Sequence, residues 1–336
     1  MAVLDVTRLT LTDLAKRTDP NGSVADIAEM LAQTNAPLQD IPWIAGNEPT
    51  SHRVTIRTGL PSVYYRAVNA GVPNSKSTTA QVVESMAMLE ARSLIDMKLL
   101  KLNGNSASFM TSESRPFIEA MNQAQLDGIF YGNSAVDQKQ YTGLSTRYGS
   151  LTAGNAQNII DAGGTGTDNT SVWLVVWGPE TIFGTYPPGS MGGLAVKSLG
   201  EQPVADASGN RFQAMETVFQ WDCGLVVKDW RYAVRVCNID VSNLVGETSA
   251  ADLIKLMSRA TDRIPSAGMG KAAFYCNRTV MSMLKIQALN KSSNALGFAQ
   301  AINQTGGTSL GQVEYNFLGI PLRQCDRLTL AEARVV

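Results

Sequence analysis

The sequence predicts an α+β protein built around a central antiparallel sheet. Residues 171–240 carry four of the five tryptophans, and their β-branched and aromatic runs are interrupted by Gly and Pro turns, which is typical of several strands packed on a core. Helical spacing of apolar residues elsewhere, above all over 114–131, predicts helices that accompany this sheet. A chain of 336 residues can bury a sizeable core, and we expect two or more subdomains.

The composition argues against several classes of protein. The formal net charge is −1 and the basic residues are dispersed, so no strong field attracts nucleic acid or an anionic membrane. The low charged fraction, 17%, suits a protein with much surface covered in an assembly. We expect no signal peptide and no membrane-spanning run. The four cysteines contain no C-x-x-C, which favours free buried thiols over a metal site or a Cys223–Cys237 disulfide.

The N-terminal residues predict an arm with little core of its own. Apolar residues at helical spacing indicate two short helices within 1–35, separated by turn residues at 19–23. An extended connector follows over 37–43, where Trp43 is either a core anchor or an interface anchor. Because such an arm buries little surface, we expect it to dock on another part of the chain or on another chain.

Residues 50–80 predict a long projecting hairpin. Strand-like alternation over 53–58 and 62–68 flanks Gly59-Leu60-Pro61, and a polar return follows over 69–76. A two-stranded hairpin is only marginally stable alone in water, so we expect a neighbour to cover it. The candidate contact residues here are Arg53, Arg57, Tyr64, Tyr65, Arg66 and Lys76.

The next segments predict a long helix. Residues 80–102 fit either a helix or a long bent strand. The clearest helix spans 114–131, with Pro116 in its first turn and Gly132-Asn133 as its stop. Its expected buried stripe consists of Phe117, Met121, Ala124 and Gly128.

The Trp-rich region predicts strands over 172–177, 218–232 and 233–236, with a turn region over 178–189. The glycine-rich tract 161–170 precedes a strand and lacks G-x-G-x-x-G and Gly-Lys-Ser/Thr, so we interpret it as a surface turn, not a phosphate loop. The candidate contact residues of the turn region are Tyr186, Pro187 and Pro188. The candidate core anchors are Trp173, Trp177, Trp221, Trp230, Phe117 and Met121.

The C-terminal third alternates helices and strands. Helical spacing predicts a helix over 249–264, with Ser249 and Asp252 spaced as a cap and its acid. A strand over 271–276 and a helix over 277–288 follow. A closing hairpin is predicted from strands at 313–317 and 320–324 around Leu318-Gly319.

No catalytic, cofactor-binding or metal-binding group emerges from the sequence. The single histidine, His52, has no cysteine or acidic cluster nearby and is expected to be a surface or packing residue. Gly-x-Ser-x-Gly is absent, and no cysteine is marked as activated. Trp221 and Trp230 with Arg231 could stack a sugar, but at strand spacing such residues are more often core and cross-strand pairs.

Taken in order, the chain resembles the major capsid protein of tailed double-stranded DNA phages, which has the Hong Kong 97-type fold. The order is a docking arm, a projecting loop, a long spine helix, a central sheet and a returning hairpin. The phrases that carry the resemblance, to a podovirus-like branch in particular, are residues 117–121, 130–133, 141–144, 185–194, 219–225, 229–240 and 317–322.

The resemblance implies an N-terminal arm over 1–49, an E-loop over 50–80, a peripheral P-domain over 81–150 and 301–336, and an axial A-domain over 151–300. It implies a structural, non-enzymatic protein that self-assembles into hexamers and pentamers of an icosahedral virion capsid around packaged double-stranded DNA. Procapsid maturation, assembly in the host cytoplasm, a separate scaffolding protein, a portal protein, a possible decoration protein and generic DNA contact would follow, without cofactor or membrane. Some relatives crosslink through a loop lysine, but no partner Asn or Glu is evident for Lys76.

Three other functions stay open at this point. An encapsulin-like nanocompartment shell shares the fold and would package an enzyme instead of DNA. A sugar-active enzyme could use the Trp-rich sheet. A tail protein or another structural virion protein would also suit a chain without visible chemistry.

Overall fold

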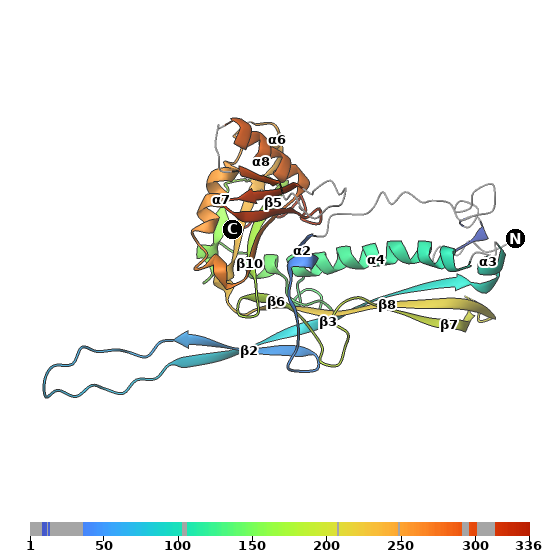
Figure 1. The fold of residues 1–336 in the computed structure, drawn as a ribbon, viewed down its shortest axis with the longest axis horizontal. Helices are drawn as coiled ribbons and strands as arrows, with labels where there is room; N and C mark the ends of the chain where they lie inside the picture. The colour runs from blue at the N-terminus through green and yellow to red at the C-terminus, as the bar shows by residue number, and fades with distance from the viewer. Residues whose placement is uncertain are drawn as a thin grey trace.

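The computed structural model describes residues 9–11, 13, 36–102, 106–206, 208–247, 249–290, 296–300 and 313–336. The molecule is elongated (Figure 1). Helix α4 (Ser106–Tyr131) lies along a set of long strands, and a compact sheet-and-helix body sits over one end of that helix. A hairpin projects beyond this end, away from the rest of the helix. The two arm helices expected within 1–35 fall almost entirely outside the described residues.

The described strands form one 13-stranded sheet, whose main path runs β11-β12-β13-β10-β5-β6-β8-β3-β2. Strands β1, β4, β7 and β9 pair beside this path. The bounds are β1 Trp43–Ala45, β2 Ser51–Gly59, β3 Thr78–Asp96, β4 Ile159–Asp161, β5 Asn169–Trp177, β6 Ile182–Tyr186, β7 Ala195–Ala205, β8 Arg211–Val227, β9 Ala233–Asp240, β10 Lys271–Cys276, β11 Leu296–Gln300, β12 Val313–Phe317 and β13 Ile320–Gln324.

Strand β5 is the centre of the compact body, and all of its residues are buried. Because side chains alternate along a strand, Trp173 and Trp177 join the core under α4, whereas Val172 and Leu174 join a second core on the other face. The second core is closed by α7 (Leu253–Thr261) and α8 (Arg278–Asn290). A strand buried on both faces explains the continuous apolar run in its sequence.

Helix α4 begins earlier than the sequence predicts. It starts at Ser106, so Pro116 lies inside the helix and the prediction that this proline occupies the first turn is wrong. The extra turns are held by Phe109, which packs with Ile95 and Leu99. The predicted buried stripe is also partly wrong, because Ala124 is exposed.

Residues 80–102 form nearly all of a long strand and then a short helix. Strand β3 extends to Asp96 and α3 (Met97–Leu102) follows, so of the two alternatives the strand is confirmed up to that point. Strand β3 also replaces the predicted hairpin partner of β2. Residues 62–68 form no strand, and β2 pairs instead with 78–85 across the hairpin.

The central region contains more strands than predicted. The run 172–177 is confirmed as part of β5, and 233–236 as part of β9. The predicted turn region over 178–189 contains β6, which pairs with β8. Strand β8 ends at Val227, so 229–232 is wrong as a strand; a short 3-10 turn, Trp230–Tyr232, is capped there by the Asp229 side chain. Strand β7 was not predicted.

The remaining elements largely follow the sequence. Strand β10, helix α8 and the hairpin β12–β13 are confirmed, and the hairpin turns at Leu318 and Gly319, whose φ angles of 49° and 81° suit a tight two-residue turn. Helix α7 is capped by Asp252, which accepts a hydrogen bond from the Lys255 N–H, so the predicted start at Ser249 is wrong. The predicted extended connector is partly wrong, since it begins with helix α2 (Ala36–Asp40).

Short helices and buried thiols complete the subunit. The short elements are α5 (Leu144–Arg147), α6 (Val241–Val245) and the 3-10 turns Ala156–Asn158 and Ala267–Met269. All four cysteines are free and buried, as predicted, and burial raises the pKa of Cys223 to about 12. None of the helices in the described parts of the chain combines the length and apolar character needed to cross a membrane.

Candidate functional site

The single histidine, His52, which could suggest an enzyme, takes part in packing. His52 meets Phe183 edge-on with ring centroids 5.4 Å apart, and burial lowers its pKa. Within the described residues, no three His, Cys, Asp or Glu side chains come together as metal ligands. This histidine therefore serves packing at the base of the projecting hairpin.

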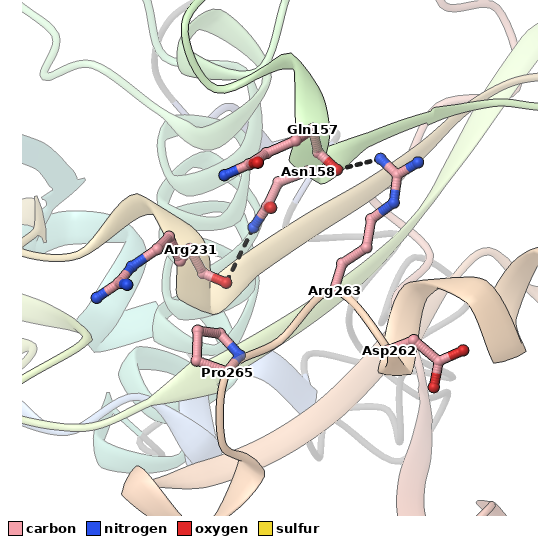
Figure 2. Close-up of a pocket in the computed structure, with 6 residues that line it drawn as sticks. All are labelled: Gln157, Asn158, Arg231, Asp262, Arg263 and Pro265. Atoms are coloured by element: carbon pink, nitrogen blue, oxygen red, sulfur yellow. Dashed lines mark hydrogen bonds between the residues drawn. The ribbon is translucent and has the colours of Figure 1, made fainter.

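The side chains of a pocket beside the 3-10 turn Trp230–Tyr232 also have structural roles (Figure 2). Asn158 donates to the backbone carbonyl of Arg231 at 2.9 Å, and Arg263 donates to the carbonyls of Gln157 and Ile159. The Arg231 guanidinium pairs with Asp229 at 2.7 Å. These side chains bind backbone and neighbouring groups of their own chain, which leaves this hollow without an evident set of ligand-binding groups.

The most unusual surface is the projecting hairpin formed by β2, the first residues of β3 and the tip between them, residues 60–77. Nearly every tip residue is exposed, although several are large and apolar: Val63 is 93% and Val68 90% exposed. Tyr64 and Tyr65 are exposed as well. The tip extends away from the body (Figure 1), so no core among the described residues covers it.

The hairpin carries an excess of positive charge. No acidic residue lies between Glu48 and Glu84, whereas Arg53, Arg57, Arg66 and Lys76 fall in that interval, all exposed. A salt bridge of 2.7 Å joins Arg53 to Glu48, and the Arg66 side chain donates to the Ala70 carbonyl. The hairpin is thus a basic and apolar projection on a chain with a net charge of −1.

The root of the hairpin is firmly fixed. Arg147 of α5 holds Glu84 with two hydrogen bonds of 2.7 and 2.5 Å, and Glu84 is buried. Val54 packs with Phe183 and Val226 on the same part of the sheet. A fixed root orients the exposed tip, because bidentate arginine–carboxylate pairs restrict geometry.

A second open surface lies on β3, β7 and β8, here called the long sheet. Leu89 and Phe219 face α4, where Phe117 stacks on Phe219 at 5.2 Å, whereas Met88 points to the other side and is 84% exposed. Residues 85–96 hold two acids and one base, and 195–227 hold four acids and two bases. The long sheet therefore carries apolar groups and net negative charge.

The turn that carries Tyr186, Pro187 and Pro188 lies against its own chain. Ser190 donates to Asp222 of β8 at 2.9 Å, and the Tyr186 ring packs beside Gly192, where a side chain would collide with it. Pro188 is exposed, and Tyr186 and Pro187 are half-buried. The turn thus borders the long sheet.

The structure places the candidate core anchors at different depths. Trp173, Trp177, Trp221 and Met121 are buried, whereas Phe117 and Trp230 are half-buried at the margin of the same core. Of the two alternatives for Trp43, the structure supports the core anchor, since Trp43 packs on Trp221 with centroids 6.0 Å apart; the buried Asp40 was not predicted. The available signal was an acid beside the apolar Ile41-Pro42-Trp43.

The comparisons with known proteins decide the family. The family model described as major capsid protein GP7 matches residues 19–336. The chain belongs to this family of major capsid proteins. A solved structure of bacteriophage epsilon15 has 32% sequence identity, covers 100% of this chain and 99% of its own, and gives a TM-score of 0.76.

More distant solved structures also match. The bacteriophage JBD30 capsid has 10% identity over 90% of this chain and 93% of its own, with a TM-score of 0.48. The SrpI encapsulin from Synechococcus elongatus PCC 7942 has 12% identity over 68% and 96%, with a TM-score of 0.45. No curated protein matches. The GP7 family assignment confirms the phage capsid and its Hong Kong 97-like fold over the encapsulin and enzyme alternatives.

This GP7-family chain is therefore a structural subunit of a bacteriophage capsid, a shell built from many copies of one protein. The exposed hairpin and the open long sheet are the surfaces of the described chain that such a role makes relevant.

Proposed function

We propose that copies of this capsid protein form hexamers and pentamers of an icosahedral shell around packaged double-stranded DNA, and that the hairpin of each copy docks on the long sheet of a neighbour. The observation that carries the docking is the hairpin tip, residues 60–77, which exposes large apolar side chains away from the cores of the described residues.

Complementary charge supports a second copy as the occupant. The hairpin carries four bases and no acid between Glu48 and Glu84, and the long sheet carries an excess of acids. Opposite charges on two surfaces favour one relative orientation and disfavour wrong ones. Apolar residues lie on both surfaces, for example Val63 on the tip and Met88 on the sheet, and burying them supplies the driving force.

We propose a division into an arm over 1–49, an E-loop over 50–80, a peripheral part and an axial part. Packing supports grouping β7 and β8 with β3 and α4 in the peripheral part. Packing likewise supports grouping β12 and β13, which lie beside β10, with the axial part built on β5. These groupings shift the boundaries expected from the sequence at 195–227 and 313–324.

The further partners follow from the same proposal. Shell assembly in the host cytoplasm would use a scaffolding protein and a portal protein, with a possible decoration protein outside. Contact with packaged DNA would be generic, because the basic residues are dispersed and the net charge is −1. Maturation of a procapsid would proceed by rigid-body rotation of subunits, with bending at the arm and the hairpin.

Charge reversal tests the docking. The double variant Arg57→Glu with Arg66→Glu keeps both residues exposed and should abolish closed shells in electron micrographs of the expressed protein. Adding Glu90→Lys with Glu201→Lys on the long sheet should restore part of the shell yield. The control pair Lys139→Glu with Arg278→Glu reverses two bases outside both surfaces. Normal shell yield from the Arg57 and Arg66 double variant would refute this contact.

A further inference from the structure

A buried carboxylate fixes the point where the N-terminal arm joins the subunit. Asp40 is the last residue of α2, and its side chain is fully buried. Its two oxygens lie 2.6 Å from Lys271 Nζ and 3.0 Å from Arg323 Nε. The Tyr275 hydroxyl donates to the same carboxylate at 2.6 Å. Burying a carboxylate is costly unless it is paired and hydrogen-bonded; here it is paired with two cations, and its Oδ2 accepts the hydrogen bond from Tyr275.

The groups that receive Asp40 come from two neighbouring strands. Lys271 and Tyr275 lie four residues apart on β10 and so share one face of the sheet. Strand β13 pairs with β10 in parallel, and Arg323 lies directly opposite Tyr275. The sheet therefore assembles a notch of two cations and a hydroxyl, and one carboxylate from a distant segment fills it.

Trp177 sets the direction of the hydrogen bonds. Its indole N–H donates to the Tyr275 hydroxyl oxygen at 2.8 Å, which leaves the hydroxyl proton for Asp40. Burial raises the pKa of Tyr275 well above its usual value, with the negative charge of Asp40 adding to the effect, so this donor stays protonated. Trp177 thus ties the ionic notch to the main core.

The residues after Asp40 are held at a second place. Strand β1 pairs with β6, and the Gly46 N–H donates to the Tyr186 carbonyl at 2.8 Å. The Trp43 ring occupies the space above Gly184, where a Cβ atom would lie 2.5 Å from it. Residues 40–46 are thereby mounted on the sheet at two points, and β2 with the projecting hairpin begins shortly after them.

We propose that Asp40 is a positioning residue for capsid assembly: by filling the Lys271–Tyr275–Arg323 notch, it fixes residues 36–46, which lead into the projecting hairpin, on the subunit. Asp40 acts through these residues, since it is buried within its own chain. This inference rests on the proposed shell assembly. The notch itself needs no partner and can be tested separately from it.

The test uses the full-length protein with Asp40→Asn, which keeps the size of the side chain and removes its charge. Hydrogen exchange of the amides over 41–46 should become at least tenfold faster, while exchange over β5 and β9 stays unchanged. Shell yield should fall at least tenfold. Glu180→Gln, which removes an exposed partner of Lys228, is the matched control and should change neither measurement.

Compensation separates positioning from a general loss of stability. In Asp40→Asn with Lys271→Met, one of the two cations that face Asp40 is removed, so protection over 41–46 and shell yield should partly return. If Asp40→Asn does not fold, Asp40→Glu keeps the charge but misplaces it by one methylene, and should show the same local loss. Unchanged exchange over 41–46 would overturn the proposal. Faster exchange with normal shells would overturn the link to assembly, while the hairpin variants still test shell docking independently.

Discussion

Removing the Glu332 carboxylate should cost the subunit about 3–5 kcal/mol, the range measured when one partner of a buried ion pair is deleted. Glu332 and Arg235 are each 5% exposed, and their closest N–O distance is 2.9 Å. Ser171 donates to the same carboxylate oxygen, and Tyr131 of α4 donates to the other oxygen at 2.7 Å. Glu332→Ala would leave Arg235 charged, buried and without its anion.

The size of the effect follows from the contacts that Arg235 retains when Glu332 is replaced. Its guanidinium still donates to Ser171 and to the Tyr148 carbonyl, and it lies over the Trp173 ring at 5.2 Å. These contacts do not neutralise a charge that water cannot reach, so most of the desolvation cost remains uncompensated. A loss of about 3 kcal/mol already changes the folding equilibrium more than a hundredfold.

Urea unfolding of the purified subunit, followed by tryptophan fluorescence, measures this cost. Glu332→Ala and Arg235→Met should each be strongly destabilising. The double variant Arg235→Met with Glu332→Leu should lie within about 2 kcal/mol of the unchanged protein, because apolar residues of similar volume can replace a buried pair. If Glu332→Ala costs no more than the exposed control Glu180→Gln, the network does not stabilise the subunit as argued.

Three further predictions concern the core, the hairpin root and the arm. Trp221→Ala should destabilise the subunit by about 3–5 kcal/mol in the same unfolding assay, because Trp221 is 7% exposed and packs on Trp43; an unchanged midpoint would contradict this. Burial lowers the pKa of His52 below 6.5, so the stability it contributes is present above pH 6.5 and declines as pH falls towards the lower folded value; His52→Gln should flatten that dependence. Deleting residues 1–35 should leave the melting temperature nearly unchanged but prevent regular shells in electron micrographs.

The elements predicted best are those whose local sequence pattern is compatible with only one kind of structure. Strand β5 reads as a continuous apolar run because both of its faces are covered, and the β12–β13 turn needs the Leu318-Gly319 pair. Strand β7 escaped prediction because it is an edge strand whose many exposed residues leave a weak apolar pattern. The early start of α4 depends on Phe109 meeting Ile95, a contact that periodicity cannot reveal.

The hairpin was predicted as a candidate surface from composition and chain order, whereas the long sheet and the contacts that fix the hairpin were not. Exposed residues of the hairpin could be named because a long two-stranded projection has no core. The pairs Glu84–Arg147, Asp40–Lys271 and Arg235–Glu332 join residues far apart in the sequence. Charge pairs of this kind have no local spacing signal, so only the folded sheet brings them together.

At the hairpin tip, the strand preference of the local sequence conflicts with the observed fold. This conflict indicates a partner outside the subunit. Residues 62–68 have the alternation of a strand, yet they form none and remain exposed. Natural sequences usually agree with their fold at every level, and disagreement concentrates where function requires it. The exposed apolar side chains of the tip, such as Val63 and Val68, are unfavourable in water within a single chain. We infer that its stabilising partner is another copy in the shell, which is the contact that reversal of Arg57 and Arg66 tests.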